Sequence, residues 1–143
     1  MKRVIVSGYF NPLHGGHLDM IEAGAAMGDY LIVVLNNDKQ QLLKKGKVIL
    51  SEDNRARVMK SLRLVDEVRL SVDTDPTVIR TLRSIAEDYP DDELVFGQGG
   101  DRDSDKVNPE VDVCRENNIM IQYGLGEGKP DSSTRINKDL GLE

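Results

Sequence analysis

Cysteine, long apolar runs and amino-terminal targeting patterns are scarce or missing in this chain of 143 residues, and each scarcity excludes a class of protein. The single cysteine, Cys114, excludes an intrachain disulfide and makes a cytoplasmic location the default expectation. No apolar run approaches the roughly 20 residues that a membrane-spanning helix needs, and no signal-peptide pattern precedes the first apolar segment. We therefore expect a protein with no membrane partner.

Basic residues are also in the minority. The chain holds 19 lysines and arginines against 25 aspartates and glutamates, which gives a formal net charge of −6. This balance argues against a nucleic-acid partner, because nucleic-acid binders normally show a basic face. The cluster Lys44, Lys45 and Lys47 stands out against it, since an acidic protein that binds a triphosphate must concentrate positive charge at the phosphates. The alternative is a solvated lysine loop.

Histidine occurs only twice, as His14 and His17, in the glycine-rich run from Gly8 to Leu18. The run follows a short apolar strand and opens a helical pattern, so backbone N–H groups and the positive end of the helix dipole can meet a phosphate there. Two imidazoles three residues apart can face one bound group and stabilise charge on a transferring phosphoryl group. The alternatives are two surface histidines or half of a zinc site, although zinc needs three or four ligands.

Short apolar segments alternate with helical patterns along the whole chain. Expected strands are Arg3–Ser7, Tyr30–Asn36, Glu67–Ser71, Glu93–Phe96 and Ile119–Tyr123. Expected helices run from Gly16 to Met27, from Ser51 past Leu62, from Pro76 to Asp88, from Pro109 to Asn117, and onward from Ser132 or Ser133. This alternation predicts an α/β fold: a single Rossmann-like domain over residues 1–143, with a five-stranded parallel sheet flanked by helices. Cys114 is expected to be a packing residue of one helix.

The long loops of this pattern all follow strands. They are Gly8–Gly16, Asn36–Leu50, Gly97–Asp105 and Gly124–Asp131. Ligands of parallel sheets bind beyond the carboxyl ends of the strands, so these loops are expected to form the site. We see no dedicated protein metal cage in the sequence and expect no protein metal site.

The run from Gly8 to Leu18 resembles the HxGH signature of the nucleotidyltransferase superfamily, which includes cytidylyltransferases and several adenylyltransferases. The short cytidylyltransferases read GTFD where this chain has Gly8, Tyr9, Phe10 and Asn11. The segment Ser132-Ser133-Thr134 resembles the second signature of the superfamily. The resemblance implies that His14 and His17 are catalytic. It also implies a set of nucleotide-binding residues: Gly8, Tyr9, Phe10, Gly16, Ser132, Ser133 and Thr134.

The block from Lys44 to Val68 resembles the same branch, with a lysine-rich loop, a helix containing an arginine and a segment like RYVDEV. By this resemblance Lys44 and Lys47 grip the triphosphate from a mobile loop. Arg55 approaches the phosphates or the acceptor, Asn11 binds the acceptor or lies at the interface, and Arg63 lies at the interface of a homodimer. On physical grounds alone, Arg63 and Asp66 could equally form a surface ion pair worth little.

The segment Gly97-Gln98-Gly99-Gly100-Asp101 resembles both the GxDW segment of cytidylyltransferases and the GGDY segment of heptose-phosphate adenylyltransferases. The resemblance places Gly99 and Asp101 against the base and ribose. The extra glycines leave room in such a pocket, which favours adenine. We assign no role to Arg102, Lys129 or Arg135.

Together these features predict a nucleotidyltransferase that uses Mg²⁺. CTP with a small phosphorylated acceptor such as glycerol 3-phosphate is the first choice. ATP with a sugar phosphate, a flavin or a cofactor precursor is the alternative, favoured by Asn11-Pro12 and Gly99-Gly100-Asp101. A nucleotide-binding sensor that keeps the fold without turnover is a further alternative.

Overall fold

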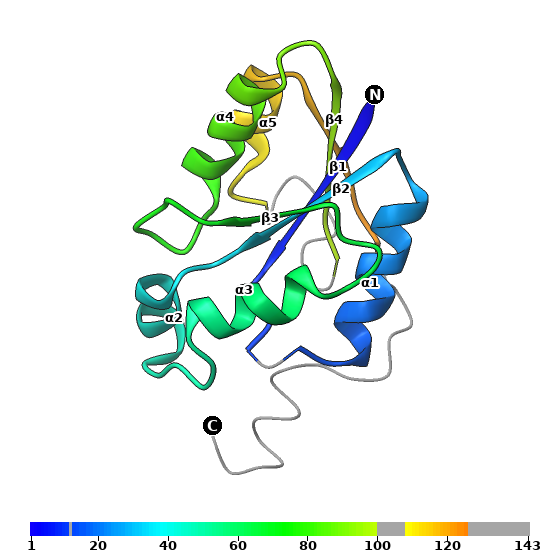
Figure 1. Ribbon diagram of the computed structural model, residues 1–143. Coiled ribbons are helices and arrows are strands. Elements are labelled where there is room, and N and C mark those ends of the chain that lie inside the picture. The colour runs from blue at the N-terminus through cyan, green and yellow to red at the C-terminus, as the bar shows by residue number, and fades with distance from the viewer. Residues whose placement is uncertain (12, 100–107, 126–143) are drawn as a thin grey trace.

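The computed structural model describes residues 1–11, 13–99 and 108–125. In these residues, five parallel strands form one sheet in the order β3-β2-β1-β4-β5 (Figure 1). The strands are β1 Lys2–Gly8, β2 Tyr30–Leu35, β3 Glu67–Leu70, β4 Glu93–Gly97 and β5 Ile119–Gln122. All four pairings are parallel. The predicted α/β fold and its five strands are confirmed, and the expected last helix lies outside the described residues.

The central strands are apolar because helices cover both faces of the sheet. Five of the six residues of β2 are buried, and the register pairs Val4 with Leu31 and Ile5 with Ile32. Continuous apolar runs of this kind are typical of parallel strands buried on both sides. β1 and β4 pair at the centre of the sheet, and the direction in which successive strands are added reverses between them. A crevice opens at such a reversal, at the carboxyl ends of the strands.

The helices form two layers (Figure 1). One layer holds α1 (Gly15–Ala26) and α3 (Glu52–Lys60), and the other holds α4 (Ile79–Asp88) and α5 (Val111–Glu116). Each layer has its own buried core. The α1 side includes Val4, Val6, Met20, Ile21, Leu31, Val33, Met59 and Leu125. The α4 side includes Ile5, Ile32, Val34, Val78, Leu82, Ile85, Phe96 and Cys114.

The segment after β2 differs from the expectation of one long loop. It contains the helix α2, Asp38–Lys45, so Lys44 and Lys45 lie in a helical last turn. Asn37 accepts the N–H of Gln40, while the Gln40 side chain accepts the N–H of Asn37, which forms a reciprocal cap. Gly46 ends the helix with φ of 75°, a conformation that glycine adopts without strain.

Two further expectations concern α4 and α5. The fourth helix begins at Ile79, not at Pro76, because Asp73 caps it from a distance by accepting the N–H groups of Arg80 and Thr81. Cys114 packs in the core of α5 as expected, and burial, with the charge of Glu110, raises the pKa of its thiol to about 12. Among the described residues, no helix is both long and apolar enough to cross a membrane.

Candidate active site

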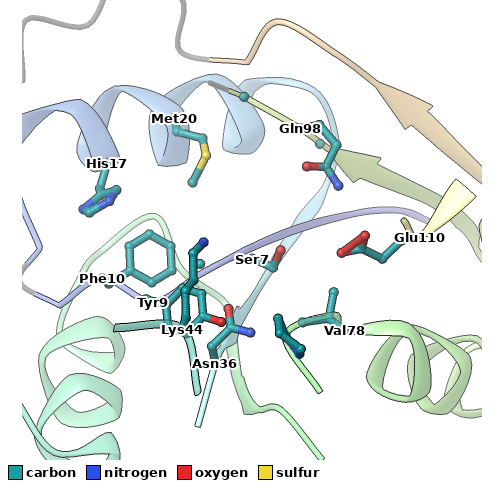
Figure 2. Close-up of a pocket in the computed structure, with 14 residues that line it drawn as sticks. Ser7, Tyr9, Phe10, His17, Met20, Asn36, Lys44, Val78, Gln98 and Glu110 are labelled. Carbon is teal, nitrogen blue, oxygen red and sulfur yellow. The ribbon is translucent and has the colours of Figure 1, made fainter. Parts of the chain in front are cut away.

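A cavity of about 240 Å³ opens at the carboxyl ends of β1, β2 and β4 (Figure 2). It lies at the crevice between β1 and β4 that the strand order predicts. Its described lining residues come from the ends of these strands, from α1 and α2, and from the segments before α4 and α5. They are Ser7, Gly8, Tyr9, Phe10, His17, Met20, Asn36, Lys44, Pro76, Val78, Gly97, Gln98, Gly99 and Glu110.

The two histidines form the start of α1. The Nδ1 atom of His14 accepts the N–H of Gly16 at 3.0 Å, and the Nδ1 atom of His17 accepts the N–H of His14 at 3.2 Å. Since Nδ1 is the acceptor in both rings, each neutral imidazole carries its proton on Nε2. The rings stack with centroids 3.7 Å apart. His17 lines the cavity, whereas His14 lies outside the cavity lining and stacks on His17.

Phe10 and Gly8 shape the floor beside His17. Phe10 has φ of 50°, a left-handed conformation that is rare for a bulky residue, and its side chain is buried. Its ring contacts His17 edge to face, with centroids 4.8 Å apart. A Cβ atom on Gly8 would lie 3.0 Å from the Phe10 ring, so a larger residue at this position would press on the ring. The strained turn therefore holds the His17 ring in place.

Of the two lysines expected at the phosphates, the structure brings one to the cavity. Lys44 lines it, and its Nζ atom lies 4.8 Å from the centroid of the Tyr9 ring, a cation–π contact. Lys47 follows the helix α2 and lies outside the cavity lining. The end of β1 and the last turn of α2 thus place one ammonium group above the cavity.

Arg55 does not point at a ligand, which corrects its expected role. Its guanidinium group is fully buried and donates to the carbonyl oxygens of Leu50 (3.0 Å), Tyr9 (2.8 Å) and Asn36 (2.6 Å). It also pairs with Asp38 Oδ1 at 2.8 Å. The side chain therefore ties together the turns after β1 and β2, which carry part of the cavity wall. Its five donors fit several carbonyl groups at once, as a lysine would not.

Three other expected residues lie outside the cavity lining. The Asn11 side chain is buried and accepts the N–H of Leu50 at 2.7 Å, so it holds backbone together. Gly16 is buried in the first turn of α1. Arg63 is exposed in the turn between α3 and β3, and Asp66 accepts the N–H of Leu31 at 2.8 Å.

The glycines after β4 serve packing. A Cβ atom on Gly97 would lie 2.6 Å from Leu125 Cδ2, and one on Gly99 would lie 2.4 Å from the carbonyl oxygen of Leu125. Leu125 therefore fills the space at these two glycines, and our inference that their missing side chains leave room for adenine is wrong. The expected sites at Gly100, Asp101, Ser132, Ser133 and Thr134 lie outside the described residues.

Sequence reasoning missed several lining residues. Ser7, Met20, Asn36, Pro76, Val78, Gln98 and Glu110 all border the cavity. Asn36 and Gln98 had a general signal, because both lie in loops that were expected to form the site. Glu110 reaches the cavity because α5 packs against β5 and α4, a tertiary arrangement that no local pattern encodes. The described residues contain no group of three or more histidine, cysteine or acidic side chains that could hold a metal ion.

The arrangement can bind and polarise a phosphate ester. An imidazole N–H at a helix N-terminus and an ammonium group face one cavity, where donors and dipoles stabilise oxygens that gain negative charge.

Comparison with known proteins gives the family. The model of the cytidylyltransferase-like family matches residues 5–138. Glycerol-3-phosphate cytidylyltransferase of Bacillus subtilis is 40% identical over 68 residues, which span 48% of this chain and 53% of that protein. The bifunctional protein HldE of Gluconobacter oxydans is 40% identical over 94% of this chain and 26% of its own length. FAD synthase of Methanolacinia petrolearia is 31% identical over 90% of this chain and 83% of its length.

Solved structures agree on the fold. The lipopolysaccharide core biosynthesis protein of Thermoplasma volcanium has a TM-score of 0.65 and 25% identity, over 87% of this chain and 94% of that one. A putative nicotinate-nucleotide adenylyltransferase of Vibrio parahaemolyticus has a TM-score of 0.64 and 20% identity, over 99% of this chain and 89% of that one. With the family match over nearly its whole length, the chain belongs to the cytidylyltransferase-like family of nucleotidyltransferases.

Proposed function

We propose that this protein transfers a nucleotidyl group from a nucleoside triphosphate to the phosphate of a small acceptor and releases pyrophosphate. The observation that carries the proposal is the His17 ring, which lines the cavity at the start of α1 with its Nδ1 atom engaged by backbone. Lys44 supplies a cation at the same cavity.

In the proposed reaction an acceptor phosphate oxygen attacks the α-phosphorus in line. The new P–O bond forms as the bond to the bridging oxygen of the β-phosphate breaks, and pyrophosphate leaves with the bonding electrons. The acceptor phosphate is already anionic, so no strong general base is needed and positioning with charge stabilisation suffices. His17 donates a hydrogen bond to an α-phosphate oxygen, and Lys44 stabilises the negative charge that develops on the leaving pyrophosphate.

Mg²⁺ fits this cavity as a substrate-borne cofactor. Ser7 and Asn36 offer oxygen donors of the hard type that Mg²⁺ prefers, and neither is assigned as a fixed ligand. When bound, Mg²⁺ neutralises phosphate charge. We propose that the phosphates and water provide most of its ligands.

For the nucleotide, CTP with a phosphorylated alcohol remains the first candidate. The 40% identity to a glycerol-3-phosphate cytidylyltransferase supports it, although that match spans about half of either protein. ATP is the second candidate, because the match to an FAD synthase, whose product contains an adenylyl group, extends over most of both chains. The glycines at 97 and 99 no longer weigh toward adenine, since Leu125 fills that space.

Pyrophosphate release tests the proposal. Wild-type protein with Mg²⁺ is incubated with CTP, ATP, GTP or UTP and with glycerol 3-phosphate, a sugar phosphate or FMN. We expect one nucleotide to yield pyrophosphate only when an acceptor is present. Nucleotide binding without pyrophosphate release for every acceptor would instead favour the sensor.

We further propose a homodimer with Arg63 at its interface. The support is the family resemblance of residues 44–68 and the exposure of Arg63 in the described structure. Sedimentation at micromolar concentration is expected to show a dimer, and a species of only 15.9 kDa would refute the proposal.

A further inference from the structure

The cavity has two chemically different ends. His17, Phe10 and Met20 belong to the α1 side of the sheet. Val78 belongs to the core of the α4 and α5 side, and Glu110 directly precedes α5. In Figure 2, Gln98 and Glu110 lie at the end opposite His17. Lys44 is the only lysine or arginine among the described lining residues, and Glu110 is the only carboxylate.

Gln98 is a fixed and incompletely satisfied donor. Its backbone N–H donates to the carbonyl of Gln122 at 2.7 Å, and its carbonyl accepts the N–H of Leu125 at 2.9 Å, so the residue cannot shift easily. The residue is 5% exposed, and its Nε2 atom has no hydrogen-bond partner within the described residues. A buried amide without a partner costs free energy, so a ligand oxygen is the expected partner.

Glu110 sets the charge of this end. Its residue is 1% exposed, and its backbone N–H is held by Asn108 Oδ1 at 3.0 Å. A carboxylate there repels a phosphate and prefers a group that donates a hydrogen bond. A hydroxyl group suits both neighbours, because its oxygen can accept from Gln98 and its O–H can donate to a carboxylate oxygen of Glu110.

We infer that Gln98 and Glu110 form the subsite for the body of the acceptor and select a neutral chain that carries hydroxyl groups, as in a phosphorylated polyol or sugar. The inference rests on the proposed function. In-line displacement places acceptor and pyrophosphate on opposite sides of the α-phosphorus. With the nucleotide phosphates at the start of α1, the acceptor then extends toward the α4 and α5 side.

The test compares acceptors that differ only in hydroxyl groups. Binding of glycerol 3-phosphate and of propyl phosphate is measured by calorimetry on the full chain, with Mg²⁺ and a non-hydrolysable CTP or ATP analogue. Ribitol 5-phosphate and pentyl phosphate repeat the comparison for a larger site. We expect the wild type to prefer a hydroxylated partner by at least about tenfold, the size of one good buried hydrogen bond.

Variants then locate that preference. Gln98→Met and Glu110→Gln are each expected to reduce it about tenfold while the affinity for the nucleotide analogue stays unchanged. Gln122→Met is the matched control, since Gln122 is exposed on β5 in register with Gly97, and it is expected to keep the full preference. If Gln98→Met does not fold, Gln98→Asn replaces it. Asparagine keeps the amide group but holds it one methylene farther from the ligand.

Three results would overturn the inference. The first is a wild type that shows no preference for hydroxylated acceptors, and the second is variants that keep this preference. The third is variants with a lower affinity for the nucleotide analogue instead, which would mean that the two side chains contact the base. Failure of the proposed function looks different. In that case the wild type prefers hydroxylated acceptors and Gln98→Met removes this preference, but the wild type never releases pyrophosphate. Such a result would support the subsite and refute the transfer reaction.

Discussion

The two ends of the parallel sheet treat polar side chains in opposite ways. At the amino end, the Arg3 guanidinium lies between the rings of Tyr30 and Tyr89, at 4.3 and 3.7 Å from their centroids. Its Nε atom donates to Asp92 at 2.7 Å. Glu67 accepts from the hydroxyl groups of both tyrosines, at 2.9 and 2.6 Å. Each of these groups is satisfied by another group of the protein.

At the carboxyl end, the cavity contains a buried donor that has no partner among the described residues. Gln98 Nε2 is buried without a partner in the described residues, and Lys44 lines the cavity from the end of α2. Buried polar groups are normally paired, so incomplete pairing marks the end where binding occurs. Changes at the amino end should therefore affect stability and leave turnover unchanged, whereas changes to cavity-lining residues at the carboxyl end should affect turnover.

The largest expected effect is that of His17→Ala at the carboxyl end. We expect kcat to fall about 10²–10³-fold, because loss of one preorganised donor removes stabilisation made mainly in the transition state. Nucleotide affinity by thermal shift should change little. The control is Asp19→Ala, an exposed position on the same helix. Near-normal turnover of folded His17→Ala would refute the role of this imidazole.

Arg55 lies at the carboxyl end, but its side chain pairs within the protein, so its loss should affect stability. Arg55→Ala should lower the free energy of unfolding by about 3 kcal/mol, because three buried carbonyls and Asp38 lose their donor. Urea unfolding measures the change, and Arg57→Ala, exposed on the same helix, is the control. Equal unfolding curves for Arg55→Ala and Arg57→Ala would contradict the clamp.

Lys44 and Lys47 differ in position, because only Lys44 lines the cavity. Lys44→Ala should raise the KM for the nucleotide and reduce kcat, together about tenfold in kcat/KM, since a hydrogen bond to a charged group contributes roughly 1.5 kcal/mol and about 1.4 kcal/mol corresponds to a tenfold change in rate. Lys47→Ala should have a smaller effect, because Lys47 lies outside the cavity lining. Steady-state kinetics of both variants measure this difference, and a larger loss for Lys47→Ala would reverse the assignment.

The smallest expected effect belongs to the amino end. Burial alone would raise the pKa of Glu67, but hydrogen bonds from Tyr89, Arg69 and Tyr30 outweigh it and hold the pKa below its ordinary value of 4.5. A lowered folded pKa means that the stabilisation is present above pH 4.5 and is lost as the pH falls through the folded value.

Glu67→Gln tests this linkage. We expect the variant to lose about 1 kcal/mol at neutral pH, with unchanged kcat, and to depend less on pH during acid unfolding below pH 4.5. Unfolding followed by circular dichroism across this range measures both. An identical pH profile in wild type and variant would show that the network contributes no linkage, and a large loss of kcat would break the separation of the two ends.

Much of the fold followed from local patterns. The apolar runs of β1, β2 and β4 are buried on both faces, so each is readable without its neighbours. The helix α2 escaped prediction although Asn37, Gln40 and Gly46 give it a cap and a stop, because its lysine-rich sequence has low hydrophobicity and suggested a loop. The lesson is that caps identify a short polar helix better than its periodicity does.

The site was predictable where its chemistry lies within one segment. Gly8, Tyr9, Phe10 and His17 come from a single strand–turn–helix unit, and all four line the cavity. Arg55 was misassigned, since sequence shows a basic residue near a phosphate site but not the three carbonyls that bury it. Glu110 was missed because only the packing of α5 against the sheet brings it to the cavity.

The central claim is that the carboxyl end joins a nucleotidyl group to an acceptor phosphate. Phosphorus-31 NMR of the wild-type reaction with Mg²⁺, the nucleotide that yields pyrophosphate and its acceptor tests this directly. We predict coupled resonances of a new diphosphate bridge, with one pyrophosphate formed for each product molecule. Free nucleoside monophosphate or diphosphate without such a bridge, or an unchanged triphosphate spectrum with every acceptor, would contradict the account.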